Sequence, residues 1–290
     1  MALATSDSVA VSAQLACLLE ASAEKPGNVT PAHSFADMSY GDFLRSAAAI
    51  GPEMARAGER DVGQTILASV EATRCWTQTN TNLGIILLFA PLAKAALMQS
   101  GKATKWQSEG LRPALREVLR DLTVADAEAA YKAIRLAEPG GFEESVEHDI
   151  RSGPTVTLRE AMASAVHRDN IAAEYISDYE ITFERGLPLL VRALRDAPLQ
   201  QTIVQIYLEL LATIPDTLIG RKHGHTVAEA VSLDAARVLA LGGIFSRQGR
   251  QAIVEFDERL RKERGGLNPG TTADLVSAIL FVALLEGKIK

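Results

Sequence analysis

The stretch Leu83–Met98, LGIILLFAPLAKAALM, and the stretch Leu275–Leu285, LVSAILFVALL, are the two most apolar parts of the chain. Pro91 and Lys94 interrupt the first stretch. The second is too short to cross the roughly 30 Å hydrocarbon core of a bilayer. Both stretches are therefore predicted to be helices buried in the core of a soluble protein.

Outside these two stretches, apolar residues recur mostly at helical spacing, and alternating runs typical of strands are nearly absent. Apolar residues make up 47% of the chain and aromatic residues only 5%, which favours close-packed helices over a β-sandwich. We predict an all-α fold, with helices near residues 5–22, 39–57, 61–77, 82–100, 111–121, 124–137, 157–196 with a break near Gly186–Pro188, 199–213, 226–240, 246–262 and 271–287. No linker or charge block divides the 290 residues, so a single compact multi-helix domain over 1–290 is expected.

Charge and cysteine usage exclude several classes of protein. The formal net charge of −6 argues against a nucleic-acid surface, which usually carries a basic stripe. Cys17 and Cys75 lie in no CxxC or Cys/His spacing, so no disulfide framework or structural zinc is expected. The first residues lack the basic flank and apolar core of a signal peptide. We expect a cytoplasmic protein with no membrane partner, whose apolar helices would suit a homodimer although no segment specifies one.

Four polar stretches containing glycine or proline interrupt the helical pattern. They are 24–33 (EKPGNVTPAH), 80–84 (NTNLG), 215–223 (PDTLIGRKH) and 265–274 (GGLNPGTTAD). The second and fourth lead directly into apolar helices. Because a helix N-terminus offers unpaired N–H donors and the positive end of the helix dipole, these stretches are suited to a phosphorylated nucleotide. This interpretation requires all four to meet at one cavity.

In the first stretch, Pro26-Gly27 permits a sharp turn, Lys25 could place a charge against a phosphate, and Asn28 supplies neutral donors. The alternative is an ordinary interhelical turn with a solvated lysine. His33 and Asp37 lie four residues apart and would share a face if the segment were helical. They could then act as a base and its orienting partner, or hold a metal-bound water; a solvated pair is the alternative.

The second stretch places Asn80, Thr81 and Asn82 at the start of the most apolar internal helix. Capping of the helix explains one of the three side chains, and three in a row suggest contacts with a ligand; a purely structural role at the helix start is the alternative.

In the third stretch, Asp216 precedes Arg221, Lys222 and His223, a combination suited to magnesium and a triphosphate. A charged surface turn is the alternative. His223 and His225 form an HxH spacing without a third ligand, so a zinc site is rejected.

The fourth stretch matches neither a Walker A loop nor a dinucleotide fingerprint. It joins a tight turn to hydroxyls and to a carboxylate in the first helical turn, and its candidate ligand contacts are Asn268, Gly270, Thr271, Thr272 and Asp274. The alternative for Asp274 is a carboxylate that only complements the helix dipole.

Taken together, these stretches resemble the triphosphoribosyl-dephospho-CoA synthase family. The resemblance spans nearly the whole chain, and five motifs in one order are more specific than any one of them. The matching segments are Glu20 with Lys25-Pro26-Gly27-Asn28-Val29, His33 with Asp37-Met38 and Phe43-Leu44-x-Ser46-Ala47, Asn80-Thr81-Asn82-Leu83-Gly84, Pro215-Asp216-Thr217 with Arg221, and Leu267-Asn268-Pro269-Gly270-Thr271-Thr272-Ala273-Asp274-Leu275.

The resemblance implies an all-helical enzyme that transfers a ribosyl group from ATP with magnesium. The acceptor hydroxyl of 3′-dephospho-CoA attacks C1′ of the ATP ribose, adenine leaves, and the triphosphate stays on the sugar. This displacement passes through an oxocarbenium-like state. It therefore needs a carboxylate to activate the hydroxyl or to stabilise the positive charge, and cations to hold the triphosphate. Candidates for the carboxylate are Asp37, Asp216 and Asp274, the last two also as metal ligands, with Lys25 and Arg221 on phosphates.

Two departures from the family pattern affect the expected substrates. Asn82-Leu83 stands where the family has His-Lys, and Asn28 and Thr30 replace Leu and Asp. The motif sequences of this chain are similar to those of a divergent branch of the family, found in archaea and in bacteria with methanopterin-type cofactors. Two alternatives follow: transfer from another phosphoribosyl donor to a different alcohol, such as a methanopterin precursor, or a non-catalytic nucleotide-binding module.

Overall fold

The computed structural model describes residues 5–98, 110–138, 153–262 and 266–289, and within these ranges it contains helices and no strand, as predicted. The helices of the first half are α1 (Ser6–Ser22), α2 (Tyr40–Ala55), α3 (Val62–Arg74), α4 (Leu83–Met98), α6 (Arg112–Arg120) and α7 (Val124–Ala137). Those of the second half are α8 (Leu158–Ala165), α9 (Asn170–Ile176), the π-helix η2 (Ile181–Gly186), α10 (Leu187–Ala193), α11 (Leu199–Thr213), α12 (Thr217–His223), α13 (His225–Ala240), the short 3-10 helix η3 (Gly243–Phe245), α14 (Arg247–Lys262) and α15 (Gly270–Leu285).

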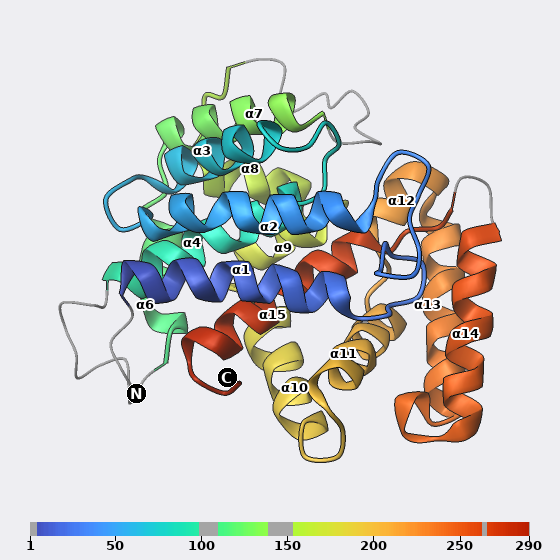
Figure 1. Ribbon diagram of the computed structural model, residues 1–290. Helices are drawn as coiled ribbons and strands as arrows, with labels where there is room; N and C mark the ends of the chain where they lie inside the picture. Colours follow the sequence, from blue (N-terminus) through green and yellow to red (C-terminus); the bar gives the residue numbers. More distant parts are fainter. Residues whose placement is uncertain (1–4, 99–109, 139–152, 263–265, 290) are drawn as a thin grey trace.

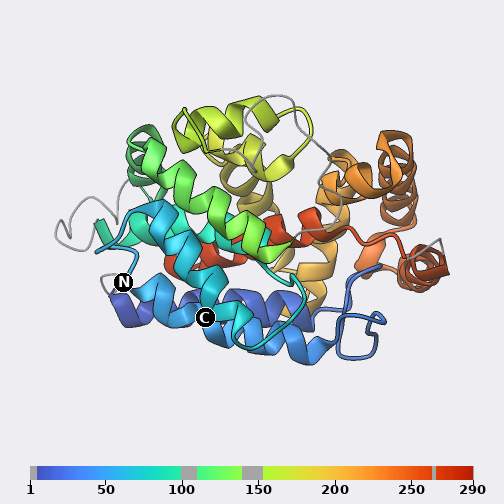
Figure 2. The same ribbon diagram turned by 90° about the horizontal axis from the view of Figure 1, so that it is seen from above.

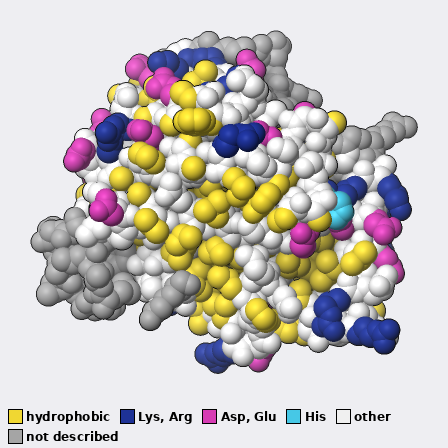
Figure 3. All heavy atoms as spheres, in the orientation of Figure 1, with side chains coloured by type: hydrophobic (Ala, Val, Ile, Leu, Met, Phe, Trp, Pro, Cys, Tyr) yellow, Lys and Arg dark blue, Asp and Glu magenta, His cyan; other side chains and the backbone are white. Residues whose placement is uncertain are grey.

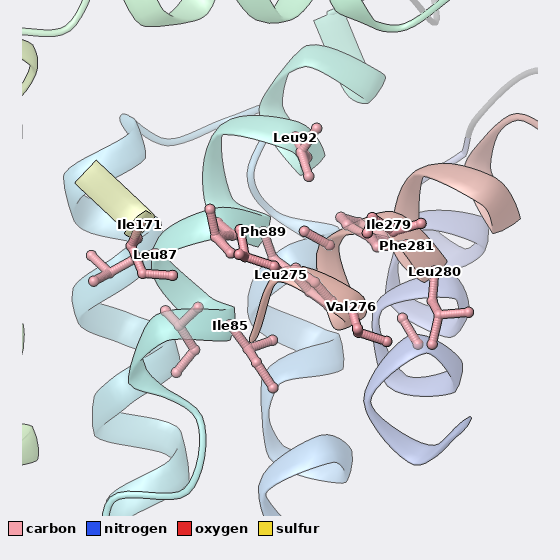
Figure 4. Packing of buried hydrophobic residues seen from close by; sticks show 14 of the residues in the cluster. Ile85, Leu87, Phe89, Leu92, Ile171, Leu275, Val276, Ile279, Leu280 and Phe281 are labelled. Carbon is pink, nitrogen blue, oxygen red and sulfur yellow. The ribbon is translucent and has the colours of Figure 1, made fainter. Parts of the chain in front are cut away.

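The two most apolar segments form the centre of the core. Helices α4 and α15 pack against each other, and the rings of Phe89 and Phe281 stack with centroids 4.3 Å apart (Figure 4). A helix that is apolar on all sides must be surrounded by other helices, and α1, α2, α3 and α6 all contact this pair. Lys94 reaches out of the core and donates a hydrogen bond of 2.6 Å to the carbonyl of Arg60.

The segment 157–196 differs from the single interrupted helix predicted for it. It is divided into α8, α9, η2 and α10, with breaks at 166–169 and 177–180. Asp178 and Tyr179 both adopt positive φ, at 52° and 60°, and this turn separates α9 from η2. Near Gly186–Pro188, where a break is predicted, the π-helix η2 passes directly into α10 without an interruption; Pro188 fits the first turn of α10, where a backbone N–H is not needed.

The third polar stretch is also more regular than predicted. Residues 217–223 form the helix α12, which begins after Asp216 and ends at Gly224, whose φ is 96°. Three residues of the predicted elements lie outside the described ranges. They are residues 99 and 100, at the end of the helix predicted near 82–100, and Gly265, at the start of the fourth polar stretch.

The loop between α1 and α2 lies against α14 and the segment that precedes α15, far away in the sequence (Figures 1 and 2). Asp257 and Arg261 of α14 both hold this loop, and they contact Gly27 and Asn28 respectively. This arrangement brings the first and fourth polar stretches side by side.

No single helix in the described ranges combines the length and hydropathy that a membrane crossing requires. Helices α11 and α12 meet the criterion only as a pair, which is bent by 55°. On the face that carries α1 and α2, apolar side chains gather over the middle of the molecule, with charged groups around them (Figure 3). The expected homodimer stays a prediction.

Candidate functional site

Asp216 is buried and joins two helices through both of its carboxylate oxygens. Its Oδ1 atom caps α12 by accepting hydrogen bonds from the N–H groups of Leu218 and Ile219, at 2.9 and 3.0 Å. Its Oδ2 atom accepts from the N–H and the hydroxyl of Thr272 in the first turn of α15, at 2.7 and 2.8 Å. These four bonds use the four lone-pair positions of the carboxylate. The contacts therefore favour a bracing role for Asp216 and Thr272 over the metal-binding, catalytic and ligand-contact roles expected from the sequence.

Asp274 has different surroundings from Asp216. It lies in the first turn of α15, and its carboxylate rests against the backbone of Gly84 in the first turn of α4: a Cβ on Gly84 would stand 2.0 Å from Asp274 Oδ2. Within the described residues, the Asp274 side chain has no hydrogen bond or ion pair. Burial raises its pKa well above the ordinary range, and the negative charges of Glu20, Asp216 and Asp169 raise it further, while Arg221 lowers it. Asp274 thus binds a proton more strongly than an ordinary aspartate does.

The start of α4 is built from the three polar side chains of the second stretch. Asn80 Oδ1 accepts from the N–H of Leu83 at 3.1 Å and is the cap that the sequence predicts. The Thr81 hydroxyl pairs with Ser46 at 2.5 Å, and the Asn82 amide donates to Thr73 at 3.3 Å. In the described part of the chain, the N–H groups of the next residues along α4, 84 and 85, have no acceptor. The start of α4 therefore keeps free donors.

Arg221 lies in the last turn of α12 and forms an ion pair of 2.9 Å with Asp169, which caps α9. Asn170 at the start of α9 donates to the carbonyl of Pro215 at 3.0 Å and to the hydroxyl of Thr217 at 3.3 Å. These contacts fix α9 against α12. The sequence shows Arg168-Asp169 only as a charge pair typical of an exposed helix, and the contact with Arg221 is not visible from it.

Asn28, in the first polar stretch, is 5% exposed and donates a hydrogen bond of 2.8 Å to Asn268 Oδ1. Its own Oδ1 atom is buried and has no partner among the described residues. Gly27 has a φ of 76°, and a Cβ there would stand 2.7 Å from the carbonyl oxygen of Leu267, so the turn requires glycine. The N–H of Gly27 donates to Asp257 at 2.8 Å. Gly27 therefore shapes the loop, and Asn28 presents an unpaired acceptor.

Lys25 lies elsewhere than expected. Its ammonium is buried, stands 2.9 Å from Glu20 Oε1, and donates to the carbonyls of Glu20 and Ala23 at 2.5 and 3.2 Å. These three acceptors match the three donors of an ammonium group. The expected contact between Lys25 and a phosphate is therefore not favoured by the structure.

The pairing expected for His33 and Asp37 requires a helix, and residues 31–39 form none. His33 is exposed, and its backbone closes a local turn with Thr30. Asp37 is exposed as well, but it lines the cavity described next. The two side chains therefore do not share a helix face.

A single cavity of about 1200 Å³ receives residues from all four polar stretches. The predicted site residues that line it are Asn28, Asp37, Asn80, Thr81, Asn82, Asp216, Arg221, Asn268, Gly270, Thr271 and Asp274. Those that do not line it are Lys25, Gly27, His33 and Thr272. The four segments thus meet in space, as the nucleotide interpretation requires.

Other residues of the cavity were given no role by the sequence. They include Glu20, Arg74, Tyr131, Ile134, Ala137, Leu158, Ala161, Met162, Ala165, His167, Arg168, Asn170 and Ile171. Many of these are apolar residues of α7, α8 and α9. In the sequence, an apolar side chain that faces a cavity looks the same as one that faces the core, so no local signal marks them.

Within the described residues, no cluster of three or more His, Cys, Asp or Glu side chains could hold a metal ion on its own. Magnesium, however, is usually bound by one or two carboxylates together with substrate phosphates. Asp274 and Asp37 line the cavity and carry no hydrogen bond or ion pair within the described ranges, so their carboxylates fit this kind of site.

Comparisons with known proteins agree with one another. The family model for ATP:dephospho-CoA triphosphoribosyl transferase matches residues 6–290. A protein of Pseudomonas paraeruginosa, assigned as a 2-(5''-triphosphoribosyl)-3'-dephosphocoenzyme-A synthase, is 33% identical over 105 residues, which cover 36% of this chain and 35% of that protein. One of Pseudomonas syringae pv. syringae with the same assignment is 33% identical over 87 residues, 30% of this chain and 29% of that protein. The match thus spans about a third of the length of these relatives.

A crystal structure from Archaeoglobus fulgidus, assigned as a triphosphoribosyl-dephospho-CoA synthase, has the same fold. It superposes with a TM-score of 0.62 and 26% identity, over 85% of this chain and 100% of that one.

Proposed function

Because the chain belongs to the ATP:dephospho-CoA triphosphoribosyl transferase family, we propose that it transfers a triphosphoribosyl group from ATP to a hydroxyl of 3′-dephospho-CoA. The hydroxyl oxygen forms a bond to C1′ of the ATP ribose, and the bond from C1′ to adenine breaks. The hydroxyl loses its proton, adenine gains one, and the triphosphate stays on the transferred ribose. The observation that carries this proposal is the meeting of the α4 and α15 N-termini in one cavity, with the Asp274 carboxylate between them.

The triphosphate is best accommodated where the helix starts converge. The free N–H groups at the start of α4 belong to residues that line the cavity, and the positive ends of the α4 and α15 dipoles favour negative charge there. Thr271, Arg221 and Lys222 also line this end. These groups supply the donors and the positive charge that a polyphosphate requires.

Asp274 is the carboxylate that acts on the reacting atoms in this proposal. In its ionised form it stabilises the positive charge that develops at C1′, and it accepts the proton of the acceptor hydroxyl. The raised pKa makes it a stronger base than an ordinary aspartate. The partnered Asp216 keeps the α15 start, and hence Asp274, in place.

Magnesium would enter with the ATP phosphates, and Asp274 and Asp37 are the carboxylates that would help to hold it. When bound, the ion would neutralise part of the triphosphate charge. The cytoplasm is the compartment that suits both nucleotide substrates.

The direct test is to incubate the purified protein with ATP, magnesium and dephospho-CoA. Released adenine is measured by chromatography, and the mass added to dephospho-CoA by mass spectrometry. We expect both products in equal amounts, and a loss of at least 100-fold in rate for Asp274→Asn with ATP binding retained. Absence of adenine under these conditions would contradict the proposal.

A second candidate is transfer of a phosphoribosyl group to a different alcohol, such as a methanopterin precursor. The observation that favours it is the second motif: Leu83 is apolar and lines the cavity, while the Asn82 amide is turned toward Thr73. The family's cation is therefore missing at this point. A screen of alcohol acceptors and phosphoribosyl donors by mass spectrometry distinguishes the two candidates. Tight ATP binding without turnover of any pair would indicate a non-catalytic binding module.

A further inference from the structure

One side of the cavity is an apolar surface made by α7, α8 and the start of α9, which we term the α7–α8 wall. Its residues are Tyr131, Ile134, Ala137, Leu158, Ala161, Met162, Ala165 and Ile171. The N–H of Leu158 donates to the carbonyl of Thr123 at 3.1 Å, which places the start of α8 beside the start of α7. The two helices contact each other and together form one continuous surface.

Two arginines line the same cavity, one near the end of α7 and one just after the end of α8. The N–H of Gly63 bonds to Asp126 at 2.7 Å, and Lys132 stands 3.7 Å from Glu71, so α3 and α7 run side by side in the same direction. Arg74, the last residue of α3, therefore lies near the end of α7. Arg168 follows α8 closely in the sequence. The wall thus suits the methylene and methyl groups of an extended chain that carries an anionic group at one end.

The proposed function leaves this wall without a substrate. The helix starts and α12 take the triphosphate of ATP, and the cavity of about 1200 Å³ is larger than the roughly 300–1000 Å³ that one small ligand usually occupies. From Ile134 to Leu158 and Met162, the wall extends over two helices. An extended chain covers such a surface better than a single planar ring does.

We propose that the α7–α8 wall binds the acyclic pantetheine arm of the acceptor dephospho-CoA, with Arg74 and Arg168 facing its diphosphate. This inference rests on the proposed function. The acceptor hydroxyl belongs to the ribose of dephospho-CoA and must lie at C1′ of ATP, close to Asp274. The diphosphate and the arm must then run away from the reacting atoms. Adenine of ATP, in contrast, is attached to C1′ itself and must leave in every turnover.

Ala161→Phe tests the wall, because its ring would occupy the space that the arm takes. Ala161 is 8% exposed and lines the cavity, whereas Ala163 on the same helix is exposed and does not line it. Ala163→Phe is therefore the matched control. Binding of ATP and of dephospho-CoA is measured separately by calorimetry, after circular dichroism has shown that each variant is folded. Ala165→Leu is the second variant if Ala161→Phe does not fold.

We expect Ala161→Phe to weaken dephospho-CoA binding at least tenfold and to change ATP binding less than twofold, with neither affected in Ala163→Phe. ADP, which has the diphosphate without the arm, should bind Ala161→Phe and the wild type equally. Weakened ATP binding with unchanged dephospho-CoA binding would overturn the inference, since the wall would then hold the donor's adenine, and the proposed function would stand. If the wild type binds neither nucleotide, the proposed function fails as well.

Discussion

The Oδ2 atom of Asp216 accepts hydrogen bonds from both the N–H and the hydroxyl of Thr272, at 2.7 and 2.8 Å. Through its other oxygen the same carboxylate caps α12. One buried side chain therefore sets the position of α12 relative to the start of α15. Together with the hydrogen bond between the hydroxyls of Thr217 and Thr271, this group helps to keep the spacing between the cations of α12 and the Asp274 carboxylate.

Asp216→Asn is expected to lower the free energy of unfolding by about 1–3 kcal/mol. The amide keeps one acceptor for the α12 cap, but its NH₂ group would face the two donors of Thr272, which leaves buried donors unpaired. Urea denaturation measures the loss, and calorimetry should show weaker ATP binding. Asp121→Asn is the control, because the Asp121 side chain is 66% exposed and its change should stay within about 0.5 kcal/mol.

Gly84→Ala should separate stability from activity. Alanine favours a helix over glycine by up to about 1 kcal/mol, so the protein should unfold at the same or a higher temperature. The new methyl group, however, would displace the Asp274 carboxylate, and we expect kcat to fall at least tenfold. Gly41→Ala in α2 is the control, since its Cβ would meet nothing closer than 3.4 Å. Unchanged kcat in Gly84→Ala would argue against a catalytic role for Asp274.

Lys25→Met tests whether Lys25 binds a phosphate or only its buried partner. The substitution leaves the Glu20 carboxylate buried without its cation, which typically costs about 3–5 kcal/mol. We expect this loss of stability with an ATP dissociation constant within threefold of the wild type. The double variant Glu20→Gln/Lys25→Met should recover most of the stability. A tenfold loss of ATP affinity in folded Lys25→Met would restore the phosphate role.

Glu174 is expected to make the free energy of unfolding depend on pH. Its carboxylate is buried and accepts hydrogen bonds from Ile181 and Thr182, and burial raises its pKa from the ordinary 4.5 to about 7, although these bonds and Arg112 act in the opposite direction. Between these two pH values the unfolded chain has released the proton and the folded protein retains it. The free energy of unfolding therefore falls as the pH rises from 4.5 to about 7, by on the order of 3 kcal/mol from this group.

Glu174→Gln should remove this contribution. Urea denaturation at several pH values would then give a flatter curve for the variant than for the wild type in this window. Parallel curves for the two proteins would show that Glu174 does not titrate there.

The helices that the sequence predicts best are those whose apolar pattern is long. Helices α4 and α15 are apolar over most of their length, and their place in the core follows from that. The turn at Asp178 and Tyr179 has no such local signal. It is held by tertiary contacts: the Tyr179 hydroxyl donates to the carbonyl of Leu88 at 2.9 Å, and Arg159 contacts the Asp178 carboxylate at 3.1 Å. Partners far away in the sequence cannot be recognised from local spacing.

The candidate site, too, is predicted in part by the local sequence and in part depends on tertiary contacts. Residue types at helix starts predict the polar end of the cavity, because capping and anion binding use the same free N–H groups. The sequence does not reveal which polar groups are already occupied. Lys25 and Asp274 both look available, yet only Asp274 has no partner among the described residues. That distinction depends on where side chains point after packing.

The contact between the α1–α2 loop and α14 has a consequence for biosynthesis. Gly27 and Asn28 are held by Asp257, Arg261 and Asn268, between 230 and 240 positions later in the chain. A nascent chain leaving the ribosome cannot make all of these contacts until it has been translated as far as Asn268. The loop can therefore close only after most of the helices have been synthesised. This late closure should be among the slowest steps of folding, because contacts between residues distant in sequence form slowly.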